Sequence, residues 1–489
     1  MGRKLVIDPV TRIEGHGKVV VHLDDDGQVA DARLHVVEFR GFEKFVQGHP
    51  YWEAPMLLQR ICGICFVSHH LCGAKVLDDI VGVGLKSGIQ VMPTAEKMRR
   101  LGHYAQMLQS HATAYFYLIV PEMMFGIDAP PEQRNILGLA EAEPELVRRV
   151  VMLRKWGQEA IKAVFGKRMH GISSVPGGVN KALEAADRDR LLEGGPDMLS
   201  ADQVIDYAQD GLRVFHEFHA KHRDEVDRFG DVPALNMCLV DDAGNVDYYH
   251  GRVRVVDDHK RVVTEFDYHD YLDHFGEAVE EWSYMKFPYL KALGREAGAV
   301  RVGPLGRLNV TKTLSTPLAQ QELERFHAYT QGRANNMTLH TNWARAIEIL
   351  HAAEVVRDLL QDPDVMKADQ LLIVPAKEAW TGEGVGVVEA PRGTLLHHYR
   401  ADAQGNTTFA NLIVATTHNN TVMNRTVRSV ADEYLAGKTE ITEGMMNAIE
   451  VGIRAYDPCL SCATHALGQM PLQVTVYGPD GDLVDERQR

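Results

Sequence analysis

Two short cysteine pairs stand near opposite ends of the chain. The first joins Cys62 to Cys65 and the second joins Cys459 to Cys462, each with two residues between the cysteines. This spacing places two sulfurs on one side of a tight turn, so each pair can offer two thiolates to one metal. Because almost the whole chain separates the pairs, a site that uses all four thiolates must lie deep in the fold. We therefore expect a buried cofactor rather than a zinc ribbon.

A single C-x-x-C pair has several interpretations. Structural zinc is the commonest, a redox-active dithiol is the second, and rarer metal centres follow. The two other cysteines, Cys72 and Cys238, are predicted to be small buried side chains. Six cysteines in a chain of this length do not form a disulfide framework, and they leave no thiolates for an iron-sulfur relay. Redox chemistry at the site would therefore need another subunit to conduct the electrons.

The composition is that of an ordinary globular protein, with 45% hydrophobic and 24% charged residues among 489. No apolar run of about 18 residues predicts a membrane span, and no secretory h-region follows Met1. We therefore expect a cytoplasmic protein, although a subunit exported on a partner's signal would look the same. The formal net charge of -15 argues against a nucleic-acid partner, because phosphate binding needs basic patches.

The elements that must position the cysteines are predicted to be mostly helices. An antiparallel hairpin comes first, with strands over residues 18–23 and 29–39 and an Asp-Gly turn between them. Apolar residues at three- and four-residue steps then predict helices. Their expected ranges are 94–121, 145–165, 201–228, 268–293, 318–331 and 341–360. Short strands are expected between residues 240 and 266, and a final hairpin over 472–476 and 483–484.

These patterns predict a fold that is mainly α with small β elements. Since no internal repeat or low-complexity linker interrupts the chain, we expect one large domain. It would be a bundle of long helices with an N-terminal antiparallel β-hairpin and peripheral α/β segments. Glycines at 382, 384 and 386 invite a nucleotide-binding interpretation, but the third glycine of a dinucleotide fingerprint is missing. No nucleotide is therefore expected to bind this chain.

The segments around the cysteines resemble motifs of one protein family. Residues 60–69 and 457–465 resemble the two metal-binding signatures of the large subunit of nickel-iron hydrogenases. Further segments resemble motifs of that family in the same order, at residues 8–16, 39–43, 170–178, 301–305 and 389–393. The resemblance covers most of the chain. Residues 66–70 and 459–465 look most like the soluble, bidirectional NAD-reducing members.

The resemblance implies the reversible heterolytic cleavage of dihydrogen by a large-subunit domain over residues 1–465. Electrons would pass to an iron-sulfur small subunit, and then to NAD at diaphorase subunits that bind flavin and NAD. Residues 466–489 would be an extension that a maturation endopeptidase removes after chaperones insert nickel. We expect the second cysteine pair not to close over the site while this extension is attached. The alternatives are a metal-free scaffold subunit of a respiratory-type complex, which the four intact cysteines oppose, and a structural zinc protein.

The resemblance also assigns roles at the metal centre. The four cysteines Cys62, Cys65, Cys459 and Cys462 would bind nickel, and Cys65 and Cys462 would bridge to an iron that carries carbon monoxide and cyanide. Soft thiolates suit both metals. Those diatomic ligands would lie in a dry cavity that Pro391, Arg392 and Thr416 line. An ordinary ion pair of Arg392 with Glu389 or Asp457 is the alternative, and the segment 415–417 departs from the Pro-Ser-Thr of many relatives.

Splitting dihydrogen also needs a base. The resemblance implies that Cys459 takes the proton and Glu14 relays it outward. The competing base is Arg392, which ranks second because deprotonating a guanidinium is costly. For Glu14 the alternative is a salt bridge to Arg12 or a helix cap.

A second, hard cation is implied behind the centre. Glu43, His465 and a backbone carbonyl near Leu412 would bind it, and Mg²⁺ is the usual ion. Oxygen ligands suit magnesium, but a histidine nitrogen is less typical, so the identity of this metal stays open. His69 is expected to hydrogen-bond a cysteine sulfur or a carbonyl, with a packed core histidine as the alternative.

Overall fold

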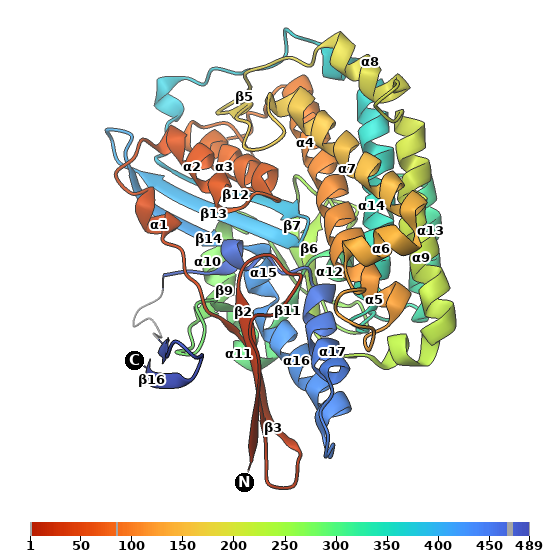
Figure 1. Ribbon diagram of the computed structural model, residues 1–489. Helices are drawn as coiled ribbons and strands as arrows, with labels where there is room; N and C mark the ends of the chain where they lie inside the picture. The colour runs from red at the N-terminus through yellow and green to blue at the C-terminus, as the bar shows by residue number, and fades with distance from the viewer. Residues whose placement is uncertain (1, 85–86, 467–472, 489) are drawn as a thin grey trace.

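Four long helices, α4, α7, α9 and α14, form a group in which α4 packs against α7 and α14, and α14 also packs against α9 (Figure 1). The structure is a computed structural model that describes residues 2–84, 87–466 and 473–488. The four helices are α4 (Pro93–Ala112), α7 (Pro144–Phe165), α9 (Ala201–Arg228) and α14 (His340–Gln361), and α13 (Pro317–Tyr329) packs on α14. The predicted ranges 145–165, 201–228, 318–331 and 341–360 are confirmed to within two residues. Their apolar stripes meet in the largest buried cluster of the protein, which includes all four paired cysteines.

The helix predicted over 94–121 is continuous but changes its winding. It begins as α4, passes through a π-helical segment, η3 (Thr113–Ile119), and continues as α5 (Val120–Phe125). The Leu118 carbonyl in the π-helical segment accepts a hydrogen bond of 3.1 Å from Arg12 Nη1. Such π segments are frequent where a helix meets a functional region.

The prediction of a helix over residues 268–293 is wrong. The chain instead forms η4 (Tyr268–Asp270), α10 (Tyr271–His274), the antiparallel strands β9 (Phe275–Ala278) and β10 (Phe287–Leu290), and η5 (Lys291–Leu293). Pro288 would interrupt a helix because it has no N–H to donate. Gly276 pairs with Tyr289, and a Cβ there would lie 2.5 Å from the tyrosine ring. The aromatic residues of this segment only imitate helical spacing.

The strands form small sheets, as the predicted fold class requires. The N-terminal hairpin is confirmed as β2 (Gly17–Leu23) and β3 (Val29–Val36), and β1 (Arg3–Ile7) adds a third antiparallel strand. A second antiparallel sheet consists of β12 (Glu383–Ala390), β13 (Gly393–Ala401) and β14 (Thr407–Ile413). A mixed sheet has the order β11, β6, β7, β8, with β6 (Leu235–Val240), β7 (Arg252–Val256), β8 (Val262–Phe266) and β11 (Val300–Arg301).

The glycines that invited a nucleotide interpretation have a packing role. Strand β12 lies against α3 (Phe66–Ile80). A Cβ at Gly384 would lie 2.3 Å from the Val76 carbonyl oxygen, and one at Gly386 would lie 2.2 Å from that of Cys72. Glycine is therefore needed here because the strand backbone touches the helix backbone.

The remaining elements connect these layers. The helical ones are α1 (Phe42–Phe45), η1 (Tyr51–Glu53), α2 (Ala54–Leu58), η2 (Gln59–Ile61), α6 (Ile136–Ala142), α8 (Ala185–Glu193), α11 (Gly294–Ala297), α12 (Pro304–Val310), η6 (Pro363–Met366), η7 (Lys377–Ala379), α15 (Ala415–His418), α16 (Asn420–Leu435), α17 (Glu443–Ala455) and α18 (Leu460–Ala463). The short strands are β4 (Ser174–Val175) and β5 (Gly178–Val179).

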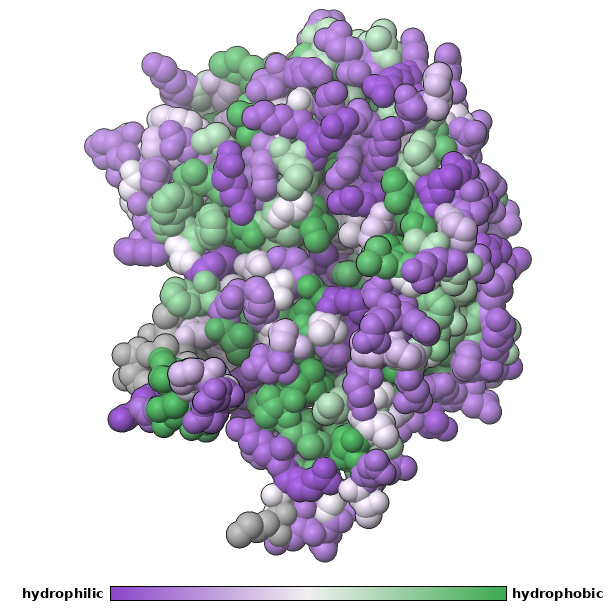
Figure 2. Space-filling model, in the orientation of Figure 1, coloured by the Kyte–Doolittle hydropathy of each residue, from purple (hydrophilic) through white to green (hydrophobic). Residues whose placement is uncertain are grey.

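A C-terminal hairpin of β15 (Gln473–Tyr477) and β16 (Leu483–Gln488) is confirmed, although Leu472 of the prediction lies outside the described residues. The hairpin and the β1–β3 sheet line one cleft. Figure 2 shows one face of the molecule, which is mostly hydrophilic with apolar side chains gathered toward its lower centre. None of the described helices combines the length and the apolar character that crossing a membrane needs.

Candidate metal centre

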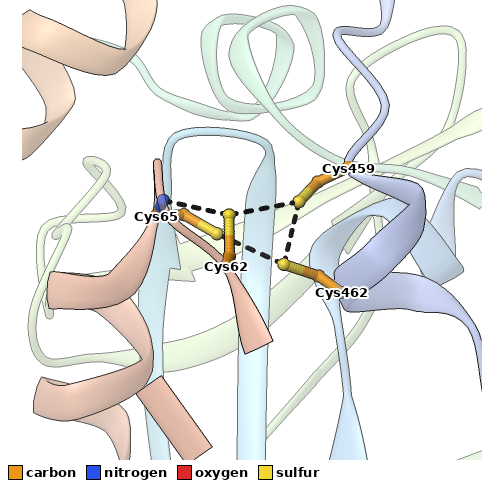
Figure 3. Close-up of side chains that lie close together, drawn as sticks. All are labelled: Cys62, Cys65, Cys459 and Cys462. Carbon is orange, nitrogen blue, oxygen red and sulfur yellow. Dashed lines mark hydrogen bonds between the residues drawn. The ribbon is translucent and has the colours of Figure 1, made fainter. Parts of the chain in front are cut away.

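The two cysteine pairs meet in the interior of the protein (Figure 3). All four sulfurs lie within 4.8 Å of one another. Cys62 Sγ is 3.5 Å from Cys459 Sγ, and Cys65 Sγ is 3.4 Å from Cys462 Sγ. None of the four residues is more than 6% exposed. The structure thus brings together the four sulfurs that the sequence separates.

Local turns aim the sulfurs at one point. Cys62 follows η2 and Cys65 is the N-cap of α3, while Cys459 is the N-cap of α18 and Cys462 lies inside it. Cys62 Sγ accepts hydrogen bonds from the backbone N–H groups of Ile64 and Cys65, at 3.2 and 3.3 Å. Such bonds stabilise the thiolate form of Cys62.

The four cysteines differ in how readily their thiols lose a proton. Hydrogen bonds from Cys459 and then from Cys462 and Cys65 lower the pKa of Cys62 well below its usual value. Burial raises the pKa of Cys459 and of Cys462. A metal cation would stabilise this cluster of buried sulfurs, because it would take the place of the thiol protons. The two isolated cysteines, Cys72 and Cys238, are fully buried as predicted.

A small cavity adjoins three of the four cysteines. Its lining contains Cys65, Cys459 and Cys462 together with the predicted residues His69, Pro391, Arg392 and Thr416. Pro391 and Arg392 form the two-residue turn between β12 and β13. Thr416, in α15, accepts a hydrogen bond of 3.1 Å from the backbone N–H of Cys459. Its hydroxyl proton is thus available to a group in the cavity.

Arg392 is paired but has one nitrogen to spare. Its Nε donates to the Asp457 carbonyl at 2.6 Å and its Nη2 to Asp457 Oδ1 at 3.0 Å. Nη1 is buried and has no hydrogen-bond partner among the described residues. Burial alone would lower the pKa of Arg392, but the Asp457 carboxylate and the thiolates of the cluster hold it well above its usual value. This arrangement suits a fixed cation better than a base.

Glu14 reaches the second pair from the N-terminal segment. Its Oε2 accepts a hydrogen bond of 3.1 Å from Ser461 N, and its backbone oxygen accepts one of 2.9 Å from Leu460 N. Burial, and then the negative charge of Cys62, raise the pKa of Glu14. The structure does not form the alternative salt bridge to Arg12, since Arg12 pairs with Glu122.

Glu43, His465 and the Leu412 carbonyl also meet. His465 Nε2 lies 3.1 Å from the Leu412 oxygen and 3.4 Å from Glu43 Oε1. Glu43 Oε1 is buried without a hydrogen-bond partner among the described residues, while Arg40 Nη1 donates to Glu43 Oε2 at 2.6 Å. Burial lowers the pKa of His465 to about 3, so its ring is neutral and can bind a cation.

Of the two interpretations of His69, the structure agrees with the packed core histidine and, among the described residues, shows no hydrogen bond from its ring to a cysteine sulfur. Its Nδ1 lies 3.1 Å from His397 Nε2, and His397 Nδ1 in turn contacts the Tyr399 hydroxyl at 2.5 Å. The residue therefore packs in a buried histidine pair at the edge of the cavity, not on a cysteine sulfur. Burial lowers the pKa of His69 to about 4, which keeps it neutral.

Two neighbours of the centre, His397 and His170, received no role from the sequence, whereas the ion pair of Asp457 with Arg392 is an alternative that the sequence suggested. His397 supports His69, His170 Nε2 lies 3.0 Å from the Cys62 carbonyl, and Asp457 holds Arg392. His397 follows an apolar strand pattern, which gives no sign of a site. His170 and Asp457 stand in segments that resemble family motifs, and both have a positive φ that marks an unusual backbone.

The expectation that the second pair stays open is also wrong. The sulfurs of Cys459 and Cys462 already lie beside those of the first pair with the C-terminal hairpin attached. His465 is 4% exposed, whereas the next residue, Ala466, is exposed. The buried site thus ends at His465, and the chain leaves the interior immediately after it.

The residues fit a nickel-iron centre. Four thiols can ligate soft metals, the buried Nη1 of Arg392 and the Thr416 hydroxyl can donate to polar ligands in the cavity, and the unpartnered Glu43 oxygen can bind a hard cation. A zinc site would explain the thiols but not the adjoining cavity with its spare donors.

Comparisons with known proteins agree with this geometry. A family model described as nickel-dependent hydrogenase matches residues 40–121 and 223–465, and one described as HoxL-like matches residues 4–39. The chain is 80% identical to the NAD-reducing hydrogenase HoxS subunit beta of Cupriavidus necator, with both chains covered completely. It is 40% identical to one subunit of the F420-non-reducing hydrogenase of Methanothermobacter thermautotrophicus, over 98% of this chain and 99% of that relative.

Solved structures give the same result. The crystal structure of an NAD+-reducing NiFe hydrogenase in the H2-reduced state matches with a TM-score of 0.90 and 47% identity, over 95% of this chain and 99% of that chain. A Ni-Fe-Se hydrogenase from D. vulgaris Hildenborough, at 22% identity and a TM-score of 0.74 over 95% of this chain and 100% of that one, shares the fold. From its sequence, its fold and its four-cysteine centre, this chain belongs to the nickel-dependent hydrogenase family and is a large subunit of the nickel-iron type.

Proposed function

We propose that this chain catalyses the reversible heterolytic cleavage of dihydrogen and passes the electrons to an iron-sulfur small subunit, from which they reach NAD at a flavin-containing diaphorase module. One observation supports this most strongly. Four buried thiols cluster beside a small cavity whose other polar lining groups include Arg392 and Thr416. The 80% identical relative is a subunit of an NAD-reducing hydrogenase, which supports the acceptor. The described residues contain no second cysteine cluster, so the electrons must leave through a partner.

The chain's own residues would hold the centre and its ligands. Cys62, Cys65, Cys459 and Cys462 would bind nickel, with Cys65 and Cys462 also reaching an iron that carries carbon monoxide and cyanide. When bound, this centre supplies the Lewis acidity and the redox capacity that dihydrogen cleavage needs. Arg392 Nη1 and the Thr416 hydroxyl would donate to the cyanide nitrogens, and Pro391 would keep water from the cavity.

The proton needs a base and a way out. Cys459 Sγ is the proposed first acceptor, and Glu14 is the proposed relay, because its carboxylate is bonded to the segment between Cys459 and Cys462. The raised pKa of Glu14 lets its carboxyl hold a proton more easily than an exposed glutamate does. Arg392 would orient and stabilise the ligands of the centre and would not act as the base, since Asp457 holds its positive charge in place.

A second cation, for which Mg²⁺ is the first candidate, would bind Glu43 Oε1, His465 and the Leu412 carbonyl. This ion would attach the end of the second cysteine segment to β14. We further propose that residues 466–489 are an extension that an endopeptidase removes after His465 once chaperones have inserted nickel, and that the enzyme works in the cytoplasm. The step from buried His465 to exposed Ala466 supports a cleavable boundary there.

The proposal is tested by co-expressing the chain with its small and diaphorase subunits. Hydrogen-dependent reduction of a viologen dye and of NAD is then measured beside the nickel, iron and zinc content. Turnover with nickel and iron bound supports the proposal. An inactive sample that is processed and nickel-loaded contradicts it, and one zinc without nickel or iron would assign the cysteines to structural zinc. Dye reduction without NAD reduction would contradict only the proposal that NAD is the electron acceptor.

A further inference from the structure

The turn that carries Pro391 and Arg392 has a conformation that a hairpin does not favour by itself. Ala390 and Gly393 are its closing pair, so only Pro391 and Arg392 lie between the strands. Two-residue hairpins favour type I′ or II′ turns, which need a positive φ at the first turn residue. Proline fixes that angle near -65°, and Arg392 is not among the residues with positive φ. This turn therefore needs support from outside the hairpin.

Arg307 in α12 provides such support. Its Nη1 donates to the Ala390 carbonyl at 2.8 Å, and its Nη2 donates to the Pro391 carbonyl at 3.0 Å. The guanidinium thus holds the last carbonyl before the turn and the first carbonyl inside it. Arg307 is 0% exposed, so water cannot replace these bonds.

The remaining donors of Arg307 are fixed by two carboxylates. Nε and Nη2 form a bidentate pair with Glu348 in α14 at 2.6 Å each, and Nη1 also donates to Glu389 Oε2 at 3.0 Å. All five N–H donors of the guanidinium are therefore in use. Glu348 in turn accepts from the Tyr248 hydroxyl at 2.9 Å. The support for the turn is rigid because it is tied to a long central helix.

Close backbone contact locks the other side of the same turn. A Cβ at Gly393 would lie 2.6 Å from the Gly303 backbone nitrogen, and one at Gly303 would lie 2.9 Å from the Arg392 carbonyl oxygen. Gly303 directly precedes α12, the helix that contains Arg307. One short helix thus fixes the turn both through its preceding backbone and through the Arg307 side chain.

We propose that Arg307, held by Glu348, is a positioning residue that sets where Pro391 and Arg392 stand over the metal-centre cavity. The residue touches neither the cavity nor the cysteines, and it acts only through the turn. This inference rests on the proposed function, because the position of Arg392 matters only if Arg392 faces ligands of a bound centre. Loosening Arg307 should then move Arg392 without removing any thiol.

The test compares Arg307→Lys and the milder Glu348→Gln with a matched control, Arg301→Lys. Arg301 is also 0% exposed, but its bonds go to Asn336 and the Val232 carbonyl, away from the turn. All three are made in the full complex with its partner subunits. The first readout is the infrared absorption of metal-bound cyanide. The second is amide hydrogen exchange of the segment 388–396 in the same complexes.

We expect the cyanide bands to shift in Arg307→Lys, and less in Glu348→Gln, with nickel content unchanged and with wild-type bands in Arg301→Lys. Exchange over 388–396 should be about tenfold faster in Arg307→Lys only, as the loss of buried hydrogen bonds predicts. If Arg307→Lys does not fold, the cyanide bands of Glu348→Gln test the inference in its place. Unchanged bands and exchange, or equal changes in Arg301→Lys, would overturn the inference. Absence of cyanide bands from the wild type would instead contradict the proposed function.

Discussion

Glu14 Oε2 accepts a hydrogen bond of 3.1 Å from the backbone N–H of Ser461, which lies between the two cysteines of the second pair. The bond joins the N-terminal segment to the metal centre across almost the full length of the chain. It places a half-buried carboxyl beside Cys459, and burial raises the pKa of that carboxyl. This position supports the proposed role of Glu14 as the group that relays a proton outward from the centre.

Replacing Glu14 with glutamine should block proton movement and leave the centre assembled. The glutamine oxygen can still accept from Ser461 N, so the segment keeps its position, but the side chain no longer exchanges a proton. We expect exchange between dihydrogen and deuterated water to fall at least about 100-fold, with nickel and iron content unchanged. Glu38→Gln is the control, since Glu38 is exposed and pairs with His16 at the surface. Wild-type exchange in Glu14→Gln would exclude the relay.

Cys459→Ser tests the ligand set. A serine hydroxyl is a hard and weakly acidic donor, so we expect nickel loss, no hydrogen activation and no removal of residues 466–489, in a protein that remains folded. Nickel analysis and the mass of the purified chain measure these effects. The control is Cys72→Ser, because Cys72 is buried like Cys459 but its thiol donates to the Gly386 carbonyl at 3.2 Å. Turnover retained in Cys459→Ser would refute the assignment.

The second cation depends on the free oxygen of Glu43. Glu43→Gln removes the negative charge while keeping a side chain that can still contact Arg40. We expect the magnesium content to fall and nickel and iron to remain, with a lower thermal midpoint because the end of the second cysteine segment loses its attachment. Glu53→Gln, at a half-buried glutamate in η1 that pairs with His49, should change neither quantity. Equal magnesium in Glu43→Gln and wild type would exclude Glu43 as a ligand.

Buried histidines should make the protein sensitive to acid. Burial lowers the pKa of His70, His103 and His351 to about 4, below the value of about 6.5 expected in the unfolded chain. Between these values the unfolded state binds more protons, so the free energy of unfolding is highest above pH 6.5 and falls as the pH drops toward 4. Each histidine lowers the free energy of unfolding by as much as about 3 kcal/mol over this pH range.

Thermal midpoints measured between pH 7.5 and pH 4.5 check this prediction. His351→Gln should flatten the profile, and His49→Gln should not, because His49 lies at the surface. A midpoint that stays constant down to pH 4.5 would contradict the assignment of neutral buried histidines.

The sequence predicted the helices well where one apolar stripe faces the core. The range 201–228 has the same bounds as α9, which Ser200 begins with a capping box and which kinks at His222. The prediction failed at 268–293, where Phe275, Phe287 and Leu290 imitate a helical stripe but lie on two short paired strands. Local periodicity cannot show that Gly276 pairs with Tyr289, since that contact forms only when the chain folds back.

The candidate site was predicted through its motifs, and most of its supports were not. The two cysteine pairs suggest a shared centre, and the surrounding motifs identify its type. The ion pair of Arg392 with Asp457 was one of the alternatives that the sequence offered for Arg392, but the pair of His69 with His397 joins distant segments, so no local pattern marks it. Arg307 is the clearest case, because five hydrogen bonds to α14 and to the β12–β13 hairpin define its role.

The most direct test of the nickel-iron assignment is infrared absorption of the purified complex. Carbon monoxide and cyanide bound to a metal absorb where protein groups do not, so the spectrum reports the centre without depending on turnover. We predict bands from both ligands in the wild type and their absence from Cys462→Ser, which replaces a proposed ligand of the iron. A processed sample that contains nickel and iron but shows no such bands would contradict the account.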